Sequence, residues 1–450
     1  MKTTFKQTQE PREKQASTSP DLIMPPMKIA IVSKSNSSGG GASRVAEQLA
    51  LRLGQREGIV AHHWMAYPAG RMKHARRLYG AAPTRVFQKT CRSISSLIGL
   101  PDFLTPEMLY FAWRQRKVRY DVVHFHDITR AVSPVGMRWL ARHMPVVWTF
   151  HDCSPFTGGC INPMGCTAYE SRCGNCPRLG LWPLNTRLDC TGFMQAYKRR
   201  TARLGLFTPV APSTWIASES VKAGFFDEPP MVIANAVDTD CFRPLDRSAI
   251  HRILGLDPNL FTILIAAGHL GDPFKGTQYA VQAINRLDRP VQVLFVGLPD
   301  ENLISACRAK RKHVIGSIGH ERFLAQYFAA ADVYLYPTVA DNLPNTVLET
   351  MACGTPTIGF RTGGMADMIE HAKNGYLVEQ GDADGLVAGL KTADEHPAVL
   401  RAWSATAETR ATTVFGYARF IDDHLRLYER VAGRTPDAPS EELARQAEAA

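Results

Sequence analysis

Residues 332–364, DVYLYPTVADNLPNTVLETMACGTPTIGFRTGG, constrain the fold more than any other segment of this chain. The first six residues are rich in β-branched and aromatic side chains, a pattern typical of a strand. After a polar loop, Asn345 can cap a short helix, and Gly354 and Pro356 end it. Residues 357–360 then form a second extended run. Because a strand, a helix and a strand follow one another so closely, the segment predicts one unit of a parallel sheet.

The same alternation of strand and helix patterns extends along most of the chain. Apolar runs typical of buried parallel strands occur at 27–33, 121–128, 145–152, 206–213, 231–237, 261–268, 291–297, 313–319 and 375–378. With 450 residues, the chain is long enough for two domains of about 200 residues each. We therefore expect an α/β fold with two Rossmann-like parallel-sheet domains, at 27–230 and 231–410, that face each other across a cleft.

The composition is that of an ordinary globular protein, with 45% hydrophobic and 21% charged residues. No apolar run approaches the roughly 18 residues of a membrane-spanning helix. The amino terminus lacks the apolar core of a signal peptide, so we expect a cytoplasmic protein. The polar residues at 1–26 and 433–450 predict disordered tails. Between the second domain and the last tail, residues 411–432 are expected to form a helix that packs back on the first domain.

The formal net charge of +10 favours anionic partners such as nucleotides, phospholipids or pyrophosphate-linked molecules. Basic clusters occur at 71–77, 114–119 and 198–203. If the first cluster is helical, Lys73 and Arg77 share one face. Such clusters are suited to peripheral contact with the anionic inner face of the cytoplasmic membrane. Alternatively, they are basic surfaces that are exposed to solvent and bind nothing. We expect no nucleic acid partner.

Two predicted strands end in the same pair of residue types. DVVHFHDI carries His126 near its end, and PVVWTFHD ends in His151 and Asp152. In open α/β sheets, ligands gather at the carboxyl ends of the strands. A single histidine there is as often structural as functional, but two strands that end alike favour a site.

Four cysteines, Cys160, Cys166, Cys173 and Cys176, lie in a Gly- and Pro-rich segment between residues 153 and 190. The last two have the C-x2-C spacing of a zinc knuckle, while the other intervals are wider than usual for ligand pairs. The segment has little apolar core of its own, so a covalent or metal cross-link between its cysteines would help to stabilise it. Structural zinc and reduced thiols both remain open, and disulfides are disfavoured in a cytosolic chain.

The second predicted domain carries residues suited to a phosphorylated ligand. Lys275 follows a predicted strand and precedes Gly276, so a cation lies beside backbone that can approach a phosphate. The helix that starts near Asn345 adds a dipole, and Glu349 adds a carboxylate. No G-x-G-x-x-G fingerprint follows the first strand, which disfavours hydride transfer. These parts predict a site for a sugar nucleotide.

The stretches LPNTVLETMACGTPTIG, HLGDPFKG, IANAVDTDCFRP and SGGGASRVAEQLA resemble the family 4 glycosyltransferases of the GT-B fold. The resemblance covers residues 27–430, and the Cys-rich segment is similar to members that build colanic-acid-type and other exopolysaccharides. It implies a retaining hexosyltransferase that uses a UDP- or GDP-sugar and needs no metal or other cofactor for catalysis. The acceptor would be a saccharide, linked to lipid pyrophosphate, in the biosynthesis of bacterial exopolysaccharide, capsule or lipopolysaccharide. The first domain would bind the acceptor and the second domain the donor.

The resemblance also assigns roles to residues. The family's two carboxylates fall on Asp341, which would contact the donor sugar, and on Glu349, which would hold the ribose. Aspartate is one methylene shorter than the family's glutamate, so we expect this position to influence the choice of donor. The family's arginine and lysine for the diphosphate fall on His269 and Lys275, and its histidine near the transferred sugar falls on His151. The predicted catalytic residues are His151, Lys275 and Glu349. The predicted substrate-binding residues are Gly40, Gly41, His126, Asp152, His269, Asp341, Asn342, Leu343, Pro344, Asn345, Thr346, Gly363 and Gly364.

Two other functions fit the same sequence. A nucleotide-sugar 2-epimerase shares the two-domain architecture but needs no acceptor, so free nucleotide diphosphate would not accumulate. A non-enzymatic protein could instead use the Cys-rich segment as a zinc-stapled interaction surface. Analysis of the products from a nucleotide sugar separates the transferase from the epimerase. Normal donor turnover but lost partner binding after all four cysteines are changed would support the interaction protein.

Overall fold

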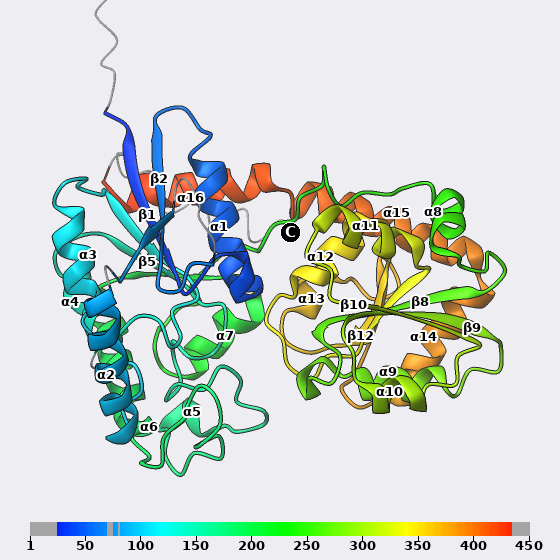
Figure 1. The fold of residues 1–450 in the computed structure, drawn as a ribbon, viewed down its shortest axis with the longest axis horizontal. Helices are drawn as coiled ribbons and strands as arrows, with labels where there is room; N and C mark the ends of the chain where they lie inside the picture. The colour runs from blue at the N-terminus through cyan, green and yellow to red at the C-terminus, as the bar shows by residue number, and fades with distance from the viewer. Residues whose placement is uncertain (1–24, 70–74, 80–81, 104, 434–450) are drawn as a thin grey trace, which may run out of the picture.

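The computed structural model describes residues 25–69, 75–79, 82–103 and 105–433, which form two lobes side by side (Figure 1). The first lobe has a seven-stranded sheet with the order β3-β2-β1-β4-β5-β6-β7. The second has a six-stranded sheet with the order β10-β9-β8-β11-β12-β13. Neighbouring strands are parallel in both sheets. The predicted α/β fold with two parallel-sheet domains is confirmed.

The elements of the first lobe run from the first strand to a short seventh strand. Its strands are β1 Met27–Ser33, β2 Ile59–Met65, β3 Ala75–Arg77, β4 Val122–Phe125, β5 Val146–Thr149, β6 Thr208–Ala211 and β7 Met231–Val232. Its helices are η1 Ser37–Gly39, α1 Gly41–Leu53, α2 Ala82–Leu97, α3 Glu107–Gln115, α4 Pro134–Ala141, α5 Ala168–Ser171, α6 Thr191–Arg203 and α7 Thr214–Lys222.

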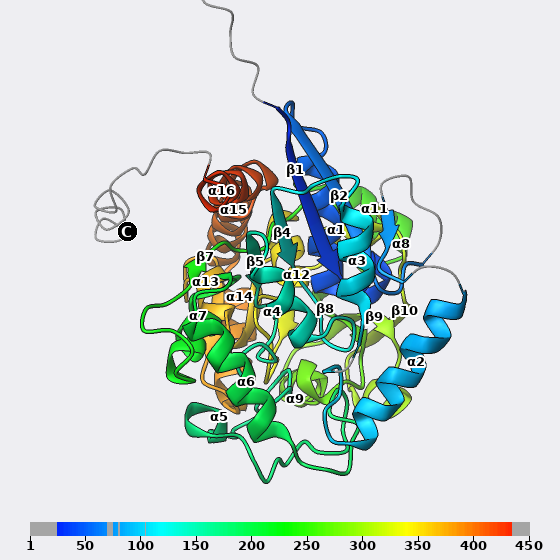
Figure 2. The ribbon, with the colours of Figure 1, turned by 90° about the vertical axis from the view of Figure 1, so that its left-hand side faces the viewer.

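The second lobe follows the same alternation. Its strands are β8 Phe261–His269, β9 Val291–Leu298, β10 Arg311–Gly316, β11 Val333–Tyr336, β12 Thr357–Phe360 and β13 Gly375–Val378. Its helices are α8 Arg247–Leu254, η2 Pro273–Lys275, α9 Thr277–Ile284, α10 Glu301–Ala306, α11 Glu321–Ala330, α12 Asn345–Ala352, α13 Met365–Met368, α14 Ala383–Glu395 and α15 Pro397–Val414. The last helix, α16 Tyr417–Val431, lies along the first lobe in Figures 1 and 2.

Helix α16 belongs to the first lobe by its packing. Its side chains Phe420, Ile421, Leu427 and Tyr428 are buried in one cluster with the apolar residues of β1 and α1. The chain therefore enters the second lobe after β7 and returns to the first between α15 and α16. Burial of four large side chains on this face contributes on the order of 1.5–3 kcal/mol each.

Some strands differ from the sequence-based prediction. Strand β7 ends at Val232, although the apolar run predicts a strand over 231–237. Beyond it, Asn235 donates hydrogen bonds to the Leu343 carbonyl at 3.1 Å and to Asn345 Oδ1 at 3.0 Å. These contacts with the second lobe replace sheet pairing. Strand β10 begins at Arg311 rather than at 313, because its basic first residues pair with β9.

The basic clusters are also more varied than predicted. Arg71 and Lys73 lie outside the described residues, and the rest of that cluster includes strand β3 rather than a helix. In the third cluster, Lys198 is buried, and Arg199 donates a hydrogen bond to the Ala223 carbonyl at 2.7 Å. This cluster therefore holds α6 against its neighbours instead of forming only a solvated face. No helix among the described residues is both long enough and apolar enough to cross a membrane.

Buried histidines form a chain beneath the carboxyl ends of β4 and β5. His124 Nδ1 lies 2.6 Å from the Tyr428 hydroxyl, and the rings of His124 and His126 are 4.1 Å apart between centroids. His126 Nδ1 lies 2.9 Å from His151 Nε2. Burial lowers the pKa of His124, His126 and His151, and it lowers the pKa of His424 to about 4. The cluster is therefore uncharged at neutral pH.

This lowered pKa predicts a pH-dependent loss of stability. Between pH 7 and pH 5 the unfolded chain protonates His424, whose ordinary pKa is about 6.5, while the folded chain does not. Stability is therefore present above pH 6.5 and falls as the pH falls. In His424→Leu we expect the drop in unfolding free energy from pH 7 to pH 5 to be smaller by about 2 kcal/mol, as measured by urea unfolding. The exposed His143→Leu is the control, and an equal pH effect in both variants would contradict the assignment.

Candidate active site

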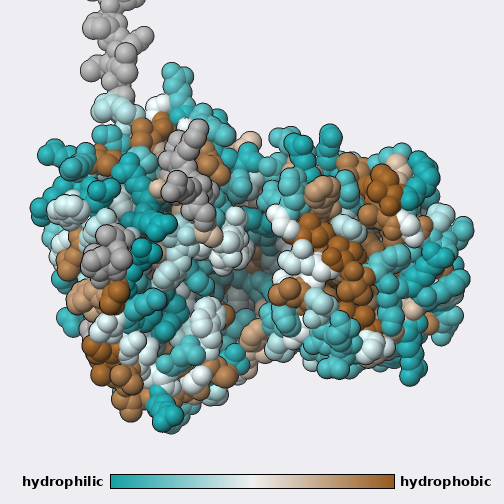
Figure 3. Space-filling view, viewed as in Figure 1, coloured by the Kyte–Doolittle hydropathy of each residue, from teal (hydrophilic) through white to brown (hydrophobic). Residues whose placement is uncertain are grey.

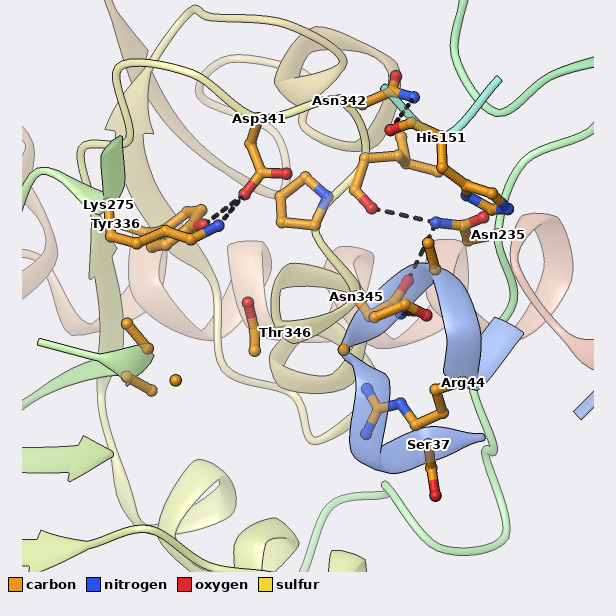
Figure 4. Close-up of a pocket in the computed structure, with 18 residues that line it drawn as sticks. Ser37, Arg44, His151, Asn235, Lys275, Tyr336, Asp341, Asn342, Asn345 and Thr346 are labelled. Atoms are coloured by element: carbon orange, nitrogen blue, oxygen red, sulfur yellow. Dashed lines mark hydrogen bonds and ion pairs between the residues drawn. The ribbon is translucent and has the colours of Figure 1, made fainter. Parts of the chain in front are cut away.

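A cavity of about 440 Å³ lies between the two domains (Figure 4). It is lined by the amino terminus of α1, His151 after β5, Asn235 in the linker, the end of β8, and the loop that leads into α12. On the molecular surface the two lobes meet along a furrow (Figure 3). The volume is within the range of small-molecule sites, and both lobes contribute to it.

Lys275 and Asp341 form an ion pair at one side of the cavity. Lys275 Nζ lies 2.6 Å from Asp341 Oδ2, and the Tyr336 hydroxyl donates to the same oxygen at 2.7 Å (Figure 4). Burial alone would lower the pKa of Lys275, but the Asp341 carboxylate holds that pKa above its usual value. The lysine is therefore charged at neutral pH. Both of these contacts with described residues are to Oδ2, so Asp341 Oδ1 can accept a hydrogen bond from a ligand hydroxyl.

The loop before α12 is fixed by hydrogen bonds that cross between the domains. Asn342 donates to the carbonyl oxygens of Phe150 and His151 at 3.0 and 3.1 Å, and it accepts from the Ser213 hydroxyl at 2.5 Å. Asn345 donates to the Gly41 carbonyl at 3.3 Å. These side chains hold the loop of the second domain against the strand ends of the first.

Glycines permit the close backbone contacts around this loop. Gly276 has a φ of 71°, and a Cβ there would lie 1.8 Å from the Pro337 carbonyl oxygen. Gly363 has a φ of 54°, and a Cβ there would lie 1.7 Å from the Asp341 carbonyl oxygen. Gly364 donates to the Asn342 carbonyl at 2.7 Å. Gly363 and Gly364 thus position residues 341 and 342 from behind and are not among the residues that line the cavity.

Glu349 is paired with an arginine of the opposite domain. Its carboxylate contacts the Arg44 guanidinium, and Arg44 also lies 3.5 Å from Glu321. Burial raises the pKa of Glu349 to about 7, although Arg44 opposes that shift. Arg44 faces the cavity, whereas Glu349 lies behind it in a smaller recess. In this arrangement, the predicted ribose carboxylate is screened from the cavity by Arg44.

The predicted residues fall into two groups. The structure brings together around the cavity Gly40, Gly41, His151, Lys275, Asp341, Asn342, Leu343, Pro344, Asn345 and Thr346. His126 is only 1% exposed and lies behind His151, so it does not line the cavity. His269 is exposed, and its Nδ1 accepts from the Gly271 amide at 3.0 Å, so it turns onto its own loop. Asp152 lines a neighbouring cavity instead.

Arg44, Tyr336, Asn235 and Ser37 also line the cavity, and the sequence patterns do not single them out. Tyr336 ends strand β11, so the strand-end rule that points to His151 could have found it. Arg44 lies in the first turn of the helix that follows the glycine loop, where its side chain shares the site of that loop. Asn235 has no such signal, because the apolar pattern predicts a strand over 231–237, whereas the strand ends at Val232 and Asn235 lies in the linker.

The four cysteines of the predicted zinc site line one small cavity within the Cys-rich segment. The Gly158 amide donates to Cys173 Sγ at 3.2 Å, and all four thiols are free. Among the described residues, no group of three or more His, Cys, Asp or Glu is arranged so that it could hold a metal ion. The geometry brings the thiols to one place without forming a ligand set, and zinc stays a prediction.

The main cavity suits an anionic group beside a polar one. It combines two cations, Arg44 and Lys275, with the amino-terminal ends of α1 and α12, whose amides favour negative charge. The Asp341 carboxylate can accept hydrogen bonds from hydroxyl groups. A diphosphate joined to a sugar has this combination of charge and hydroxyls.

Comparisons with known proteins agree with this geometry. Residues 39–241 match the family model described as Glycosyltransferase Family 4, and residues 262–393 match the one described as Glycosyl transferases group 1. The chain is 30% identical over 252 residues to D-inositol 3-phosphate glycosyltransferase 2 of Catenulispora acidiphila. The matched region covers 48% of this chain and 58% of that protein. The chain spans about half the length of the curated relatives it matches.

Solved structures share the whole two-domain arrangement. Sucrose-phosphate synthase from Thermosynechococcus elongatus is 18% identical, with a TM-score of 0.66, over 91% of this chain and 100% of that one. Anabaena HepE in complex with UDP-glucose is 17% identical, with a TM-score of 0.61, over 90% of this chain and 100% of that one. The fold is GT-B. The first domain is matched by the family 4 glycosyltransferase model, and the second domain by the group 1 glycosyltransferase model.

Proposed function

We propose that this protein is a retaining hexosyltransferase that moves a sugar from a nucleotide-diphosphate donor to a saccharide acceptor. The observation that carries the proposal is the cavity between the domains, in which Lys275, Arg44 and two helix amino termini surround the Asp341 carboxylate. HepE is described in complex with UDP and with UDP-glucose, which supports a UDP-sugar as the first donor to test.

Residues that line the cavity have separate roles in such a reaction. When the bond from the anomeric carbon to the diphosphate breaks, negative charge develops on the leaving oxygen, and Lys275 and the helix amides stabilise it. Asp341 holds the donor sugar through its hydroxyls. His151 is uncharged because burial lowers the pKa of its ring to about 3, so it can contact the sugar without adding charge.

A donor screen tests the proposal. UDP- and GDP-hexoses are added to the full chain, and a true donor raises the unfolding temperature by mass action. Nucleotide diphosphate release and the anomeric configuration of the product are then measured. Release with retained configuration is expected. An epimerised nucleotide sugar without released diphosphate would identify the epimerase instead, and no stabilisation by any nucleotide sugar would overturn the proposal.

The cellular setting is a further part of the proposal. We place the enzyme in bacterial exopolysaccharide, capsule or lipopolysaccharide synthesis, with a lipid-linked acceptor and peripheral contact with an anionic membrane. The end of α3 supports this contact, because Leu109 and Trp113 are 62% and 58% exposed beside the basic cluster at 114–119. Co-sedimentation with phosphatidylglycerol vesicles, but not with phosphatidylcholine vesicles, is expected, and Trp113→Ser should weaken it.

Structural zinc in the Cys-rich segment is proposed on the convergence of its four cysteines on one cavity. Metal analysis of the purified chain is expected to give about one zinc per chain, because four thiolates make a closed tetrahedral site. Changing Cys173 and Cys176 to Ser should release the metal, whereas changing Cys91 and Cys241, which lie outside the segment, should not. A metal-free chain in which all ten cysteines react with a thiol reagent would contradict zinc binding.

A further inference from the structure

A second cavity of about 200 Å³ adjoins the main one. The two share His151, Lys275, Asp341 and Asn342 in their walls. These shared residues mark the place where groups bound in the two cavities would meet. The second cavity is smaller, in keeping with a single sugar unit rather than a nucleotide.

The charge of the second cavity is opposite to that of the first. Besides Asp341, its walls include the carboxylates of Asp152 and Asp272, and its only cation among the described residues is Lys275, which is paired with Asp341. Carboxylates accept hydrogen bonds from hydroxyl groups and repel phosphate. The main cavity, by contrast, has two cations and two helix amino termini.

Both additional carboxylates are fixed in place and keep accepting capacity. Asp152 Oδ1 accepts from the Ser154 amide at 2.7 Å, and its Oδ2 has a long contact of 3.5 Å with the Thr129 hydroxyl. Asp272 Oδ1 accepts from the Phe274 amide at 2.9 Å. Each amide fixes its carboxylate through one oxygen, so the other oxygen can receive a ligand hydroxyl.

Aromatic and amide groups complete the walls. Trp215 is partly buried against the core of the first domain and also borders the cavity, so it offers a rigid apolar surface of the kind a sugar ring can lie on. Asn162 borders the cavity too, and its amide makes no hydrogen bond within the part of the chain that the structure describes. Carboxylates, an amide and an indole together favour a neutral carbohydrate.

The Cys-rich segment forms one wall of this cavity. It contributes Ile161 and Asn162, and the Cys153 amide donates to the Ile161 carbonyl at 3.0 Å, which ties that wall to the end of β5. Farther along the segment, the Arg178 guanidinium lies 5.5 Å from the centre of the Phe274 ring. Phe274 immediately precedes Lys275, so the segment reaches from the first domain to the loop that carries the lysine.

We infer that the second cavity is the acceptor subsite, that it takes an uncharged sugar through its hydroxyls, and that the Cys-rich segment shapes it. This inference rests on the proposed transferase function. In the transfer, an acceptor hydroxyl oxygen bonds to the anomeric carbon, the bond from that carbon to the diphosphate breaks, and the hydroxyl proton passes to the departing phosphate oxygen. Any lipid pyrophosphate on the acceptor then lies outside this cavity.

Acceptor probes test the ligand class. With the donor that the screen identifies, glucose, galactose and mannose at millimolar concentration are each expected to accelerate nucleotide release and to appear in a disaccharide. Glucose 6-phosphate and inositol 3-phosphate are expected to give at least tenfold less product, because their phosphate meets the carboxylates. The inositol phosphate probe is chosen because the name of the curated relatives points to it. A preference for either phosphate probe would overturn the inference.

Variants test the assigned walls. Asn162→Ala and Trp215→Ala are expected to raise the acceptor KM at least tenfold while the donor KM changes by less than twofold, and Trp215→Phe should restore part of the loss. Trp139→Ala on α4, away from both cavities, is the matched control. Folding is checked by the unfolding temperature, and Asn162→Ala should keep that of the wild type. Unchanged acceptor KM in both variants overturns the inference alone, whereas no nucleotide release by the wild type overturns the proposed function with it.

Discussion

Lys275→Ala is expected to lower the rate of nucleotide release by about 10²–10³-fold while leaving the fold intact. Among the described residues of the second domain, the lysine is the only basic side chain that lines the cavity, and Arg44 approaches from the other domain. In the proposed reaction, its removal takes away a charge that stabilises the departing diphosphate. Asp341 keeps the hydrogen bond from the Tyr336 hydroxyl, so the loop should stay in place.

A surface pair supplies the control for this variant. Lys391 Nζ lies 2.6 Å from Asp288 Oδ2, the same separation as in the Lys275–Asp341 pair. Lys391→Ala should change the rate by less than twofold, because exposed ion pairs contribute little and this pair is remote from the cavity. Turnover is measured as diphosphate release at saturating donor. A soluble Lys275→Ala protein with near-normal turnover would remove the lysine from the mechanism.

Gly276→Ala is expected to lower turnover by about 10²-fold and to destabilise the second domain by a few kcal/mol. The added Cβ would lie 1.8 Å from the Pro337 carbonyl oxygen, so one of the two loops must move. These loops are joined by the Val339 amide and the Thr338 hydroxyl, which both donate to the Phe274 carbonyl, at 2.9 and 2.8 Å. Movement of this unit displaces the neighbouring Lys275.

Gly255→Ala is the control that separates the clash of the added Cβ from the cost of the left-handed backbone conformation. Gly255 has a φ of 66°, close to the 71° of Gly276, but a Cβ there would meet nothing within 4 Å. It should therefore show only the cost of the left-handed conformation, about 1–2 kcal/mol, with normal turnover. Urea unfolding and diphosphate release are measured on both variants. Equal effects in the two would show that the contact with Pro337 is unimportant.

The sequence predicts the sheets well because buried parallel strands are short runs of apolar residues. Residues 27–33 and 357–360 coincide with β1 and β12. Strand β2 escapes the pattern because two histidines interrupt its apolar run, and the tertiary pairing with β1 overrides that local signal. Strand β7 is shorter than predicted because Asn235 is drawn into contacts between the domains.

The site is predictable where a residue type is tied to a position in a βα unit. Lys275 is found in this way, whereas Asp341 and the loop 342–346 come from the family resemblance, and all of them meet in the cavity. His126 and His269 have the right position but the wrong surroundings, since the histidine cluster buries one and a local turn takes the other. The contact between Arg44 and Glu349 joins residues 305 positions apart, so it depends on how the domains close and has no local signal.

The packing of α16 ties together the two ends of the described chain. The apolar face of β1 is complete only when Phe420, Ile421 and Leu427 cover it. During synthesis, the strands of the first lobe leave the ribosome well before α16 is made. The apolar face of its sheet therefore stays uncovered until nearly 200 further residues have been synthesised. The first lobe is consequently not a detachable module. Chimeras that exchange the first lobe between related proteins need two crossover points, one after β7 and one between α15 and α16.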